Sequence, residues 1–220
     1  MRELKPGLWH WQAPHPEWTE GEEWPRVVSS YALDDGERLL LFDPLAVPDE
    51  IIALASAREP VIVLTAPWHE RDAERLVERL GAPVYTEAPD SAEDIVRKFK
   101  VGPERAGDGS PDVRWLKDGK GEAHWYTPGD TLPFGIEAFG LPGHNDAILW
   151  VESARAVVCG DSLADWGDGL RPWGLLLRMG CVTEEELADS LRPVLDKPVE
   201  LVLPAHGEPA GRAALERALA

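Results

Sequence analysis

Three of the six histidines in this 220-residue chain lie beside apolar runs that have the length of a buried β-strand. His69 follows the run VIVLT, His144 precedes AILWV, and His206 follows VELVL. Asp161 takes the same position after the run AVVCG. Loops at strand ends often carry functional side chains, and histidine and aspartate hold zinc or iron at open catalytic sites. These four residues are therefore the candidate metal ligands.

The elements that must position these residues alternate between strands and helices, which is typical of an α/β protein. Apolar and β-branched runs predict strands at residues 27–33, 38–42, 61–65, 83–86, 132–139, 147–151, 156–159 and 199–203. Helical spacing of apolar residues and capping residues predict helices at residues 49–57, 73–80, 91–100, 183–195 and 210–219. The segment 101–121 is rich in glycine, proline and aspartate, which predicts an exposed excursion.

The composition fits one globular domain over residues 1–220. The 22 Lys and Arg against 40 Asp and Glu give a net charge of −18, which argues against nucleic acid or an anionic membrane as a partner. We expect a small-molecule substrate instead. The two cysteines, Cys159 and Cys181, are too few for a disulfide scaffold. With no apolar run of membrane-spanning or signal-peptide length, the sequence predicts a cytoplasmic protein.

The chain contains, in order, the segments LLLFDP, LTAPWHERDA, LPGH, GDSL and LPAHG. Together they resemble the strand and ligand loops of the metallo-β-lactamase-fold hydrolases, the group that includes glyoxalase II enzymes and lactonases. The resemblance implies an αββα sandwich, in which two mixed β-sheets lie face to face with helices outside. It also implies that His69, His144, Asp161 and His206 converge on one edge of the sandwich.

The first ligand loop departs from the family pattern H-x-H-x-D-H. In the ungapped register His69 takes the second histidine, and Pro67 replaces the first. In the same register Arg71 replaces the aspartate and Asp72 replaces the third histidine. A one-residue insertion instead puts Asp72 at the aspartate and Ala73 at the third histidine. Two ligands are lost or altered in either register, so the resemblance implies a degenerate active site.

The remaining ligands suffice for at most one metal ion, whereas the intact family holds two. Three histidines and one carboxylate suit zinc, with iron as the alternative, better than magnesium or calcium. A single metal can activate one water and polarise one oxygen, which is enough for acyl transfer, whereas phosphodiester cleavage usually relies on two metals. We therefore expect a hydrolase that acts on an ester, a thioester or a lactone.

Residues next to the ligands receive the other expected roles. Asp161 is the expected general base, or Asp72 if that residue binds no metal. Arg71 can hold a substrate carboxylate bidentately. Aromatic side chains beside the ligands predict a mouth suited to an apolar or flat ligand, formed by Trp68, Trp166 and Trp173.

A metal-free binding protein without catalytic activity is the main alternative. A salt bridge from Arg71 to Asp161 could replace a metal altogether, because a fixed positive charge repels cations in a dry pocket. Arg71 also forms a series with Arg75 and Arg79 at helical spacing, which is typical of a solvent-exposed helix face.

A GDSL-type serine esterase is a minor alternative, because GDSL at residues 160–163 is also the signature of that family. Ser162 would then be the nucleophile. However, Leu203 lies three residues before His206, where an acid is needed to orient the histidine.

The other three histidines are predicted to have structural roles. His10 and His124 lie in alternating polar and aromatic runs, which are typical of surface or edge strands. His15 lies in the stiff segment PHP, which predicts an exposed loop. Asp43 is expected to bind backbone amides rather than a metal.

Overall fold

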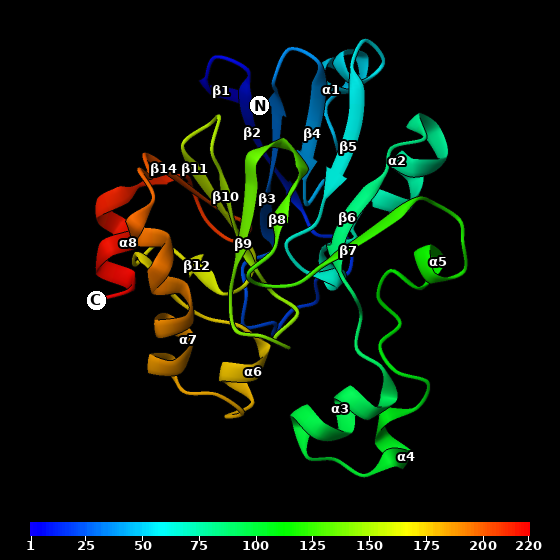
Figure 1. The fold of residues 1–220 in the computed structure, drawn as a ribbon, viewed down its shortest axis with the longest axis vertical. Coiled ribbons are helices and arrows are strands. Elements are labelled where there is room, and N and C mark those ends of the chain that lie inside the picture. Colours follow the sequence, from blue (N-terminus) through cyan, green and yellow to red (C-terminus); the bar gives the residue numbers. More distant parts are fainter.

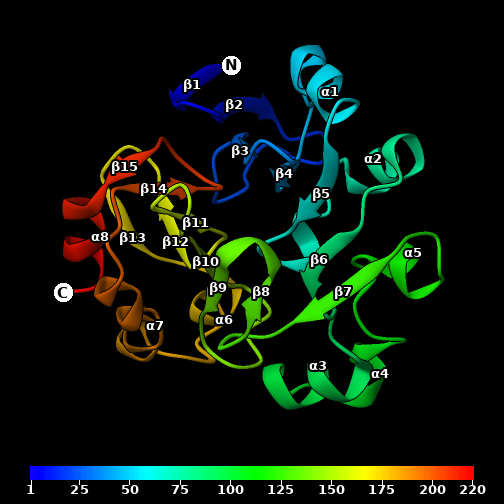
Figure 2. The same ribbon diagram turned by 45° about the horizontal axis from the view of Figure 1, so that its top comes forward.

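The computed structural model describes residues 1–220 and has four layers. Two β-sheets lie face to face, and helices cover the outer face of each (Figure 1, Figure 2). The predicted αββα sandwich is therefore confirmed. None of the helices combines the length and the apolar character that crossing a membrane requires.

The first sheet has the strand order β1-β2-β3-β4-β5-β6-β7. Its strands are β1 (Arg2–Lys5), β2 (Leu8–Pro14), β3 (Val27–Asp34), β4 (Arg38–Phe42), β5 (Glu59–Val63), β6 (Val84–Glu87) and β7 (Ala123–Tyr126). The second sheet has the order β15-β14-β11-β10-β9-β8. Its strands are β8 (Thr131–Leu132), β9 (Ile136–Phe139), β10 (Ile148–Val151), β11 (Ala156–Cys159), β14 (Leu201–Pro204) and β15 (Ala210–Gly211). A separate hairpin pairs β12 (Leu163–Asp165) with β13 (Leu170–Pro172).

Eight α-helices and three 3₁₀ helices complete the fold. The α-helices are α1 (Asp49–Ala55), α2 (Ala73–Leu80), α3 (Ala92–Phe99), α4 (Pro103–Ala106), α5 (Arg114–Lys117), α6 (Leu175–Arg178), α7 (Glu184–Leu191) and α8 (Arg212–Ala218). The 3₁₀ helices are η1 (Pro67–His69), η2 (Pro133–Gly135) and η3 (Arg192–Asp196).

Alternate residues of a strand point to opposite faces of its sheet. The apolar residues therefore form one large cluster between the two sheets and one between each sheet and its helices. In β4, Leu40 and Phe42 belong to the cluster between the two sheets, whereas Leu39 and Leu41 pack against α1, α2 and α5. In the second sheet, strand β10 alternates in the same way, and its outward residues pack against α7 and α8. A strand with both faces buried has a continuous apolar sequence, and these strands were predicted from such runs.

Some elements differ from the sequence predictions at their ends. The predicted strand 132–139 is divided, because Pro133 and the positive φ of 71° at Phe134 turn the chain through η2. The predicted helix 183–195 keeps its Thr183 capping box but becomes 3₁₀ after Leu191, where Pro193 disfavours an α-helix. The predicted helix 210–219 begins with the short strand β15. The segment 101–121 forms α4 and α5 rather than only an exposed loop.

His10 is buried, so the expectation that it lies at the surface is wrong. It belongs to β2, which β1 covers on its outer edge, and it is only 3% exposed. Its ring stacks on Tyr31 at 5.0 Å and its Nε2 lies 2.9 Å from the hydroxyl of Ser29. His124 does lie in an edge strand, β7, where it stacks on Tyr85.

The candidate site lies at one edge of the sandwich. Strands β4 and β5 are parallel, and so are β11 and β14, so their carboxyl ends are neighbours within each sheet. The two sheets are joined at this edge by backbone hydrogen bonds from Ser29 to Ala205 and from Ala147 to Thr65, at 2.8 and 2.9 Å. The loops that follow these strands therefore meet.

Candidate functional site

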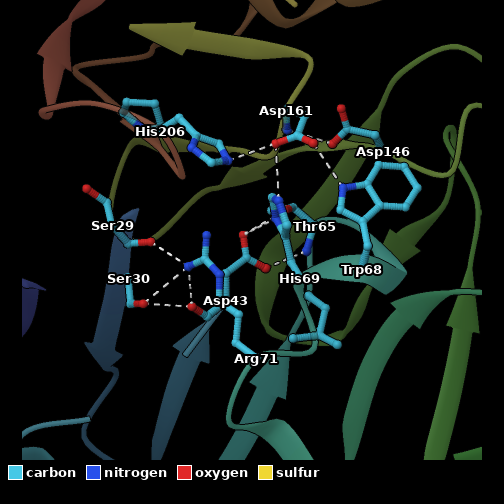
Figure 3. Close-up of polar contacts among 12 residues, drawn as sticks. Ser29, Ser30, Asp43, Thr65, Trp68, His69, Arg71, Asp146, Asp161 and His206 are labelled. Atoms are coloured by element: carbon cyan, nitrogen blue, oxygen red, sulfur yellow. Dashed lines mark hydrogen bonds and ion pairs between the residues drawn. The ribbon is translucent and has the colours of Figure 1, made fainter. Parts of the chain in front are cut away.

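Three of the four predicted ligands come together at this edge. One possible ligand atom from each of His69, Asp161 and His206 lies within 4.8 Å of the others, and all three residues are buried. His69 Nε2 lies 3.2 Å from Asp161 Oδ1, and His206 Nε2 lies 3.1 Å from the same oxygen (Figure 3). Two imidazole nitrogens and one carboxylate oxygen thus converge.

Asp43 fixes the orientation of His69. It is the residue after β4, and its Oδ1 accepts a hydrogen bond from the backbone N–H of Thr65 at 2.8 Å. Its Oδ2 accepts one from Thr65 Oγ1 at 2.6 Å and lies 3.1 Å from His69 Nδ1. Asp43 therefore binds a backbone amide, as expected, and also directs His69 Nε2 toward Asp161.

Asp146, which the sequence analysis did not single out, fixes the loop of Asp161. Its Oδ1 accepts a hydrogen bond from Asp161 N at 3.0 Å, and its Oδ2 accepts one from Ser162 Oγ at 2.6 Å. The approach is so close that a Cβ at Gly160 would lie 2.1 Å from Asp146 Oδ1. The available signal was the last of three consecutive polar residues, 144–146, directly before a buried strand.

The carboxylates control the protonation of the cluster. Burial lowers the pKa of His69, but Asp43 and Asp161 outweigh this effect and raise it to about 10. Burial tends to raise the pKa of Asp161, but His69 and His206 hold it well below its usual range. Burial lowers the pKa of His206. Without a metal, His69 is therefore protonated on both nitrogens at neutral pH, and a metal would have to displace a proton.

The donor set fits one zinc or iron ion. Ligand atoms about 2.0–2.1 Å from a tetrahedral zinc lie about 3.3 Å from one another, close to the 3.1 and 3.2 Å separations here. The contact of His69 Nδ1 with Asp43 is the type of outer contact that orients a metal-binding histidine. His206 Nδ1 is buried without a partner, so only its Nε2 has a polar contact at the cluster.

His144, the fourth predicted ligand, is not part of this cluster. It is 3% exposed, and neither of its ring nitrogens has a hydrogen-bond partner. Burial lowers its pKa to about 4, which keeps the ring neutral. It packs so closely against Gly174 that a Cβ there would lie 3.2 Å from its Cε1.

Arg71 lies at the cavity, as its expected substrate-binding role requires, but it neither pairs with Asp161 nor lies on an exposed helix face. Its Nη1 donates hydrogen bonds to the carbonyl oxygens of Ser29 and Asp43 at 2.8 and 2.7 Å, and no salt bridge joins it to Asp161. Its φ of 43° turns the chain inward before α2, so it does not lie on the exposed face of that helix. It lines the cavity beside the cluster, where its buried Nε has no partner.

Asp72 lies outside the cavity, contrary to its expected role as a base or ligand. Its Oδ2 accepts a hydrogen bond from Ala46 N at 2.6 Å, and its Oδ1 lies 3.3 Å from Arg75 Nη1. The left-handed conformation of Arg71 reverses the chain, so neighbouring side chains point to different sides.

A cavity of about 200 Å³ opens onto the cluster. Trp68 and Trp173 line it as predicted, whereas Trp166 packs behind Trp173 at a ring distance of 5.2 Å and lies outside it. The connection between β2 and β3 adds three residues that the sequence analysis did not assign to the site, His15, Glu17 and Trp24. His15 is therefore not simply a solvent-exposed loop residue. The four tryptophans within residues 1–24 were the available signal.

The geometry disfavours the serine esterase. Ser162 is fully buried and donates its hydrogen bond to Asp146. His206 contacts Asp161 instead of the serine, so no histidine is placed to activate it.

The chain has the metallo-β-lactamase fold. A metallo-β-lactamase family protein from Thermus thermophilus, TTHA1429, superposes with a TM-score of 0.60 at 17% identity, covering 99% of this chain and 78% of that one. The DIM-1 metallo-β-lactamase superposes with a TM-score of 0.61 at 14% identity, covering 99% and 93%. TTHA1623, solved in a di-iron-bound form, gives 0.53 at 24% identity, covering 87% and 93%. No family model and no curated protein matches the sequence.

Proposed function

We propose that this chain is a hydrolase with one metal ion, which acts on a small ester, thioester or lactone. One observation carries the proposal: His69 Nε2, His206 Nε2 and Asp161 Oδ1 converge at a cavity. These three residues would hold the ion, zinc or iron. When bound, such an ion supplies Lewis acidity, which lowers the pKa of water and polarises a carbonyl oxygen.

Asp161 can also orient a water molecule. A carboxylate has about four lone-pair positions. Trp68 uses one of those on Oδ2, which leaves another that can accept a hydrogen bond from a water molecule in the cavity and receive its proton as the water is activated. Asp43 and Asp146 hold the side chain of His69 and the backbone of Asp161, so the groups are oriented before substrate arrives.

Arg71 supplies a fixed positive charge. All of its hydrogen bonds start at Nη1, so Nη2 remains available to hold a substrate carboxylate or a developing oxyanion. The cavity of about 200 Å³ suits a small substrate, and Trp68 and Trp173 give it apolar walls. The net charge of −18 disfavours polyanionic phosphodiesters.

Elemental analysis and a substrate panel test the proposal. Protein purified without chelator should contain up to one zinc or iron per chain and should hydrolyse acyl reporters but not phosphodiesters. Asp161→Asn should lose metal and activity, whereas the control Asp72→Asn, altered outside the cavity, should keep both. Two metals per chain, or ester turnover that survives Asp161→Asn, would contradict the proposal.

A metal-free binding protein is the second candidate, because the cluster already forms a closed set of polar contacts. The carboxylates of Asp43 and Asp161 neutralise the protonated His69 without an ion. The buried part of Arg71 adds positive charge beside it. Protein that stays free of metal after dialysis against excess zinc and iron would support this candidate over the hydrolase.

A further inference from the structure

We infer that Trp68 is a positioning residue that holds Asp161 with a single carboxylate oxygen facing the two histidines. The inference rests on the proposed metal site. Trp68 Nε1 donates a hydrogen bond to Asp161 Oδ2 at 3.0 Å, whereas His69 and His206 contact Oδ1 (Figure 3). The two oxygens of one carboxylate are thus divided between an indole and two imidazoles.

Consecutive residues of η1 make this division possible. Trp68 and His69 project from the same short turn, with ring planes at 82° and centroids 6.4 Å apart, and both reach Asp161. Pro67 at the start of η1 restricts the backbone there. An indole N–H only donates, so Oδ2 remains an acceptor wherever Asp161 is ionised.

The indole is the only side chain that donates a hydrogen bond to Oδ2. The backbone of Asp161 is held separately, through its N–H and Asp146. The terminal torsion of an aspartate is broad, so without Trp68 the carboxylate could turn and present either oxygen, or both, to the histidines. Preorganisation of this kind commonly contributes about 10- to 100-fold to metal affinity.

The test compares zinc affinity in Trp68→Phe and Trp166→Phe, measured by competition with a chromophoric chelator. Trp166 is a matched control, because its Nε1 is buried without an acceptor and its ring lies outside the cavity. We expect Trp68→Phe to bind zinc about 10- to 100-fold more weakly than the wild type and Trp166→Phe to match the wild type. Thermal unfolding of the metal-free proteins shows whether each variant is folded.

A second measurement does not need the metal. The indole N–H resonance of Trp68, identified by its loss in Trp68→Phe, should shift upfield and exchange faster in metal-free Asp161→Asn. The resonance of Trp166 should not change. The inference would be overturned if folded Trp68→Phe bound zinc as tightly as the wild type. It would also be overturned if the Trp68 indole N–H resonance were the same in the wild type and in Asp161→Asn. Failure of the wild type to bind zinc or iron would instead overturn the proposed function, and the resonance alone would then decide the role of Trp68.

Discussion

His69 Nδ1 lies 3.1 Å from Asp43 Oδ2, and this contact joins the segments that follow two adjacent parallel strands, β4 and β5. Asp43 is 1% exposed, and its other carboxylate contacts are with Thr65, in the same loop as His69. A buried carboxylate with these partners fixes both the position and the protonation of the histidine.

Replacing Asp43 with asparagine should therefore affect both stability and metal binding. Removing one partner of a buried ion pair leaves the other charge uncompensated, at a cost of about 3 kcal/mol in the free energy of unfolding. We expect Asp43→Asn to lower the pKa of His69 from about 10 toward its ordinary value. Zinc binding should weaken, because the loss of the contact that orients His69 outweighs the easier loss of its proton. Chemical denaturation, histidine NMR titration and metal competition measure the three effects. The control Asp168→Asn removes an exposed ion pair and should change little; equal behaviour of the two variants would contradict the role of Asp43.

Alanine variants of His206 and His144 test the structure against the sequence prediction, because both residues were predicted ligands but only His206 lies in the cluster. His206→Ala should abolish metal binding, because it removes one of the three converging ligands. His144→Ala should retain most of it, because His144 lies outside that group. Elemental analysis of both variants is the measurement. Complete metal loss from folded His144→Ala would show that His144 moves into the cluster when the ion binds.

Gly160→Ala should disrupt the loop of Asp161. The added Cβ would lie 2.1 Å from Asp146 Oδ1 and 2.8 Å from Thr65 Oγ1, so either the backbone or these buried, hydrogen-bonded side chains must shift. We expect a loss of about 1–3 kcal/mol in the free energy of unfolding, together with weaker zinc binding. Gly211→Ala is the control, because its Cβ would meet nothing closer than 3.9 Å. Denaturation curves for the two variants that coincide would contradict this expectation.

Glu87 should make stability depend on pH. Burial, with Asp146, raises its pKa from 4.5 to about 8, against the opposing effect of Lys98. The folded state therefore holds a proton that the unfolded chain has lost, and stability falls as pH rises from about 4.5 to about 8. Glu87→Gln should match the wild type at pH 4.5 and be more stable at pH 8.5, by up to about 4 kcal/mol. Urea unfolding at both pH values measures the difference, with exposed Glu122→Gln as the control; a constant difference between wild type and Glu87→Gln would exclude this titration.

Arg71→Lys tests the cationic position in the cavity. Lysine keeps the positive charge but has a single nitrogen. It cannot both donate to the two carbonyl oxygens, as Nη1 of Arg71 does, and leave a second nitrogen such as Nη2 free for substrate. If the proposed hydrolysis is correct, KM for a carboxylate-bearing ester should rise about tenfold while KM for its neutral methyl ester changes little. Steady-state kinetics on the matched pair of esters measures the ratio. An equal change for both esters would show that Arg71 has only a structural role.

The sequence alone determined the α/β class, most of the strands and three of the candidate ligands, whereas the four layers were implied by the resemblance of its motifs to the metallo-β-lactamase-fold hydrolases. Strands such as β5 and β11 are buried on both faces, so they appear as continuous apolar runs, and the polar residues that follow them mark the edge where the candidate site lies. His69, Asp161 and His206 could be identified for this reason. Local signals were equally reliable, as the capping box of Thr183 and the left-handed Gly81 after α2 show.

Only the tertiary structure decided which polar residues share the site. Arg71 and Asp72 are neighbours in the chain, yet the positive φ at Arg71 directs one to the cavity and the other to Ala46. His15 joins the cavity because the connection between β2 and β3 folds over the sheet edge. His144 lies outside the cluster, and its ring packs against Gly174. Periodicity reports which face of an element is apolar, but side-chain direction in loops depends on backbone angles and on contacts between residues distant in sequence.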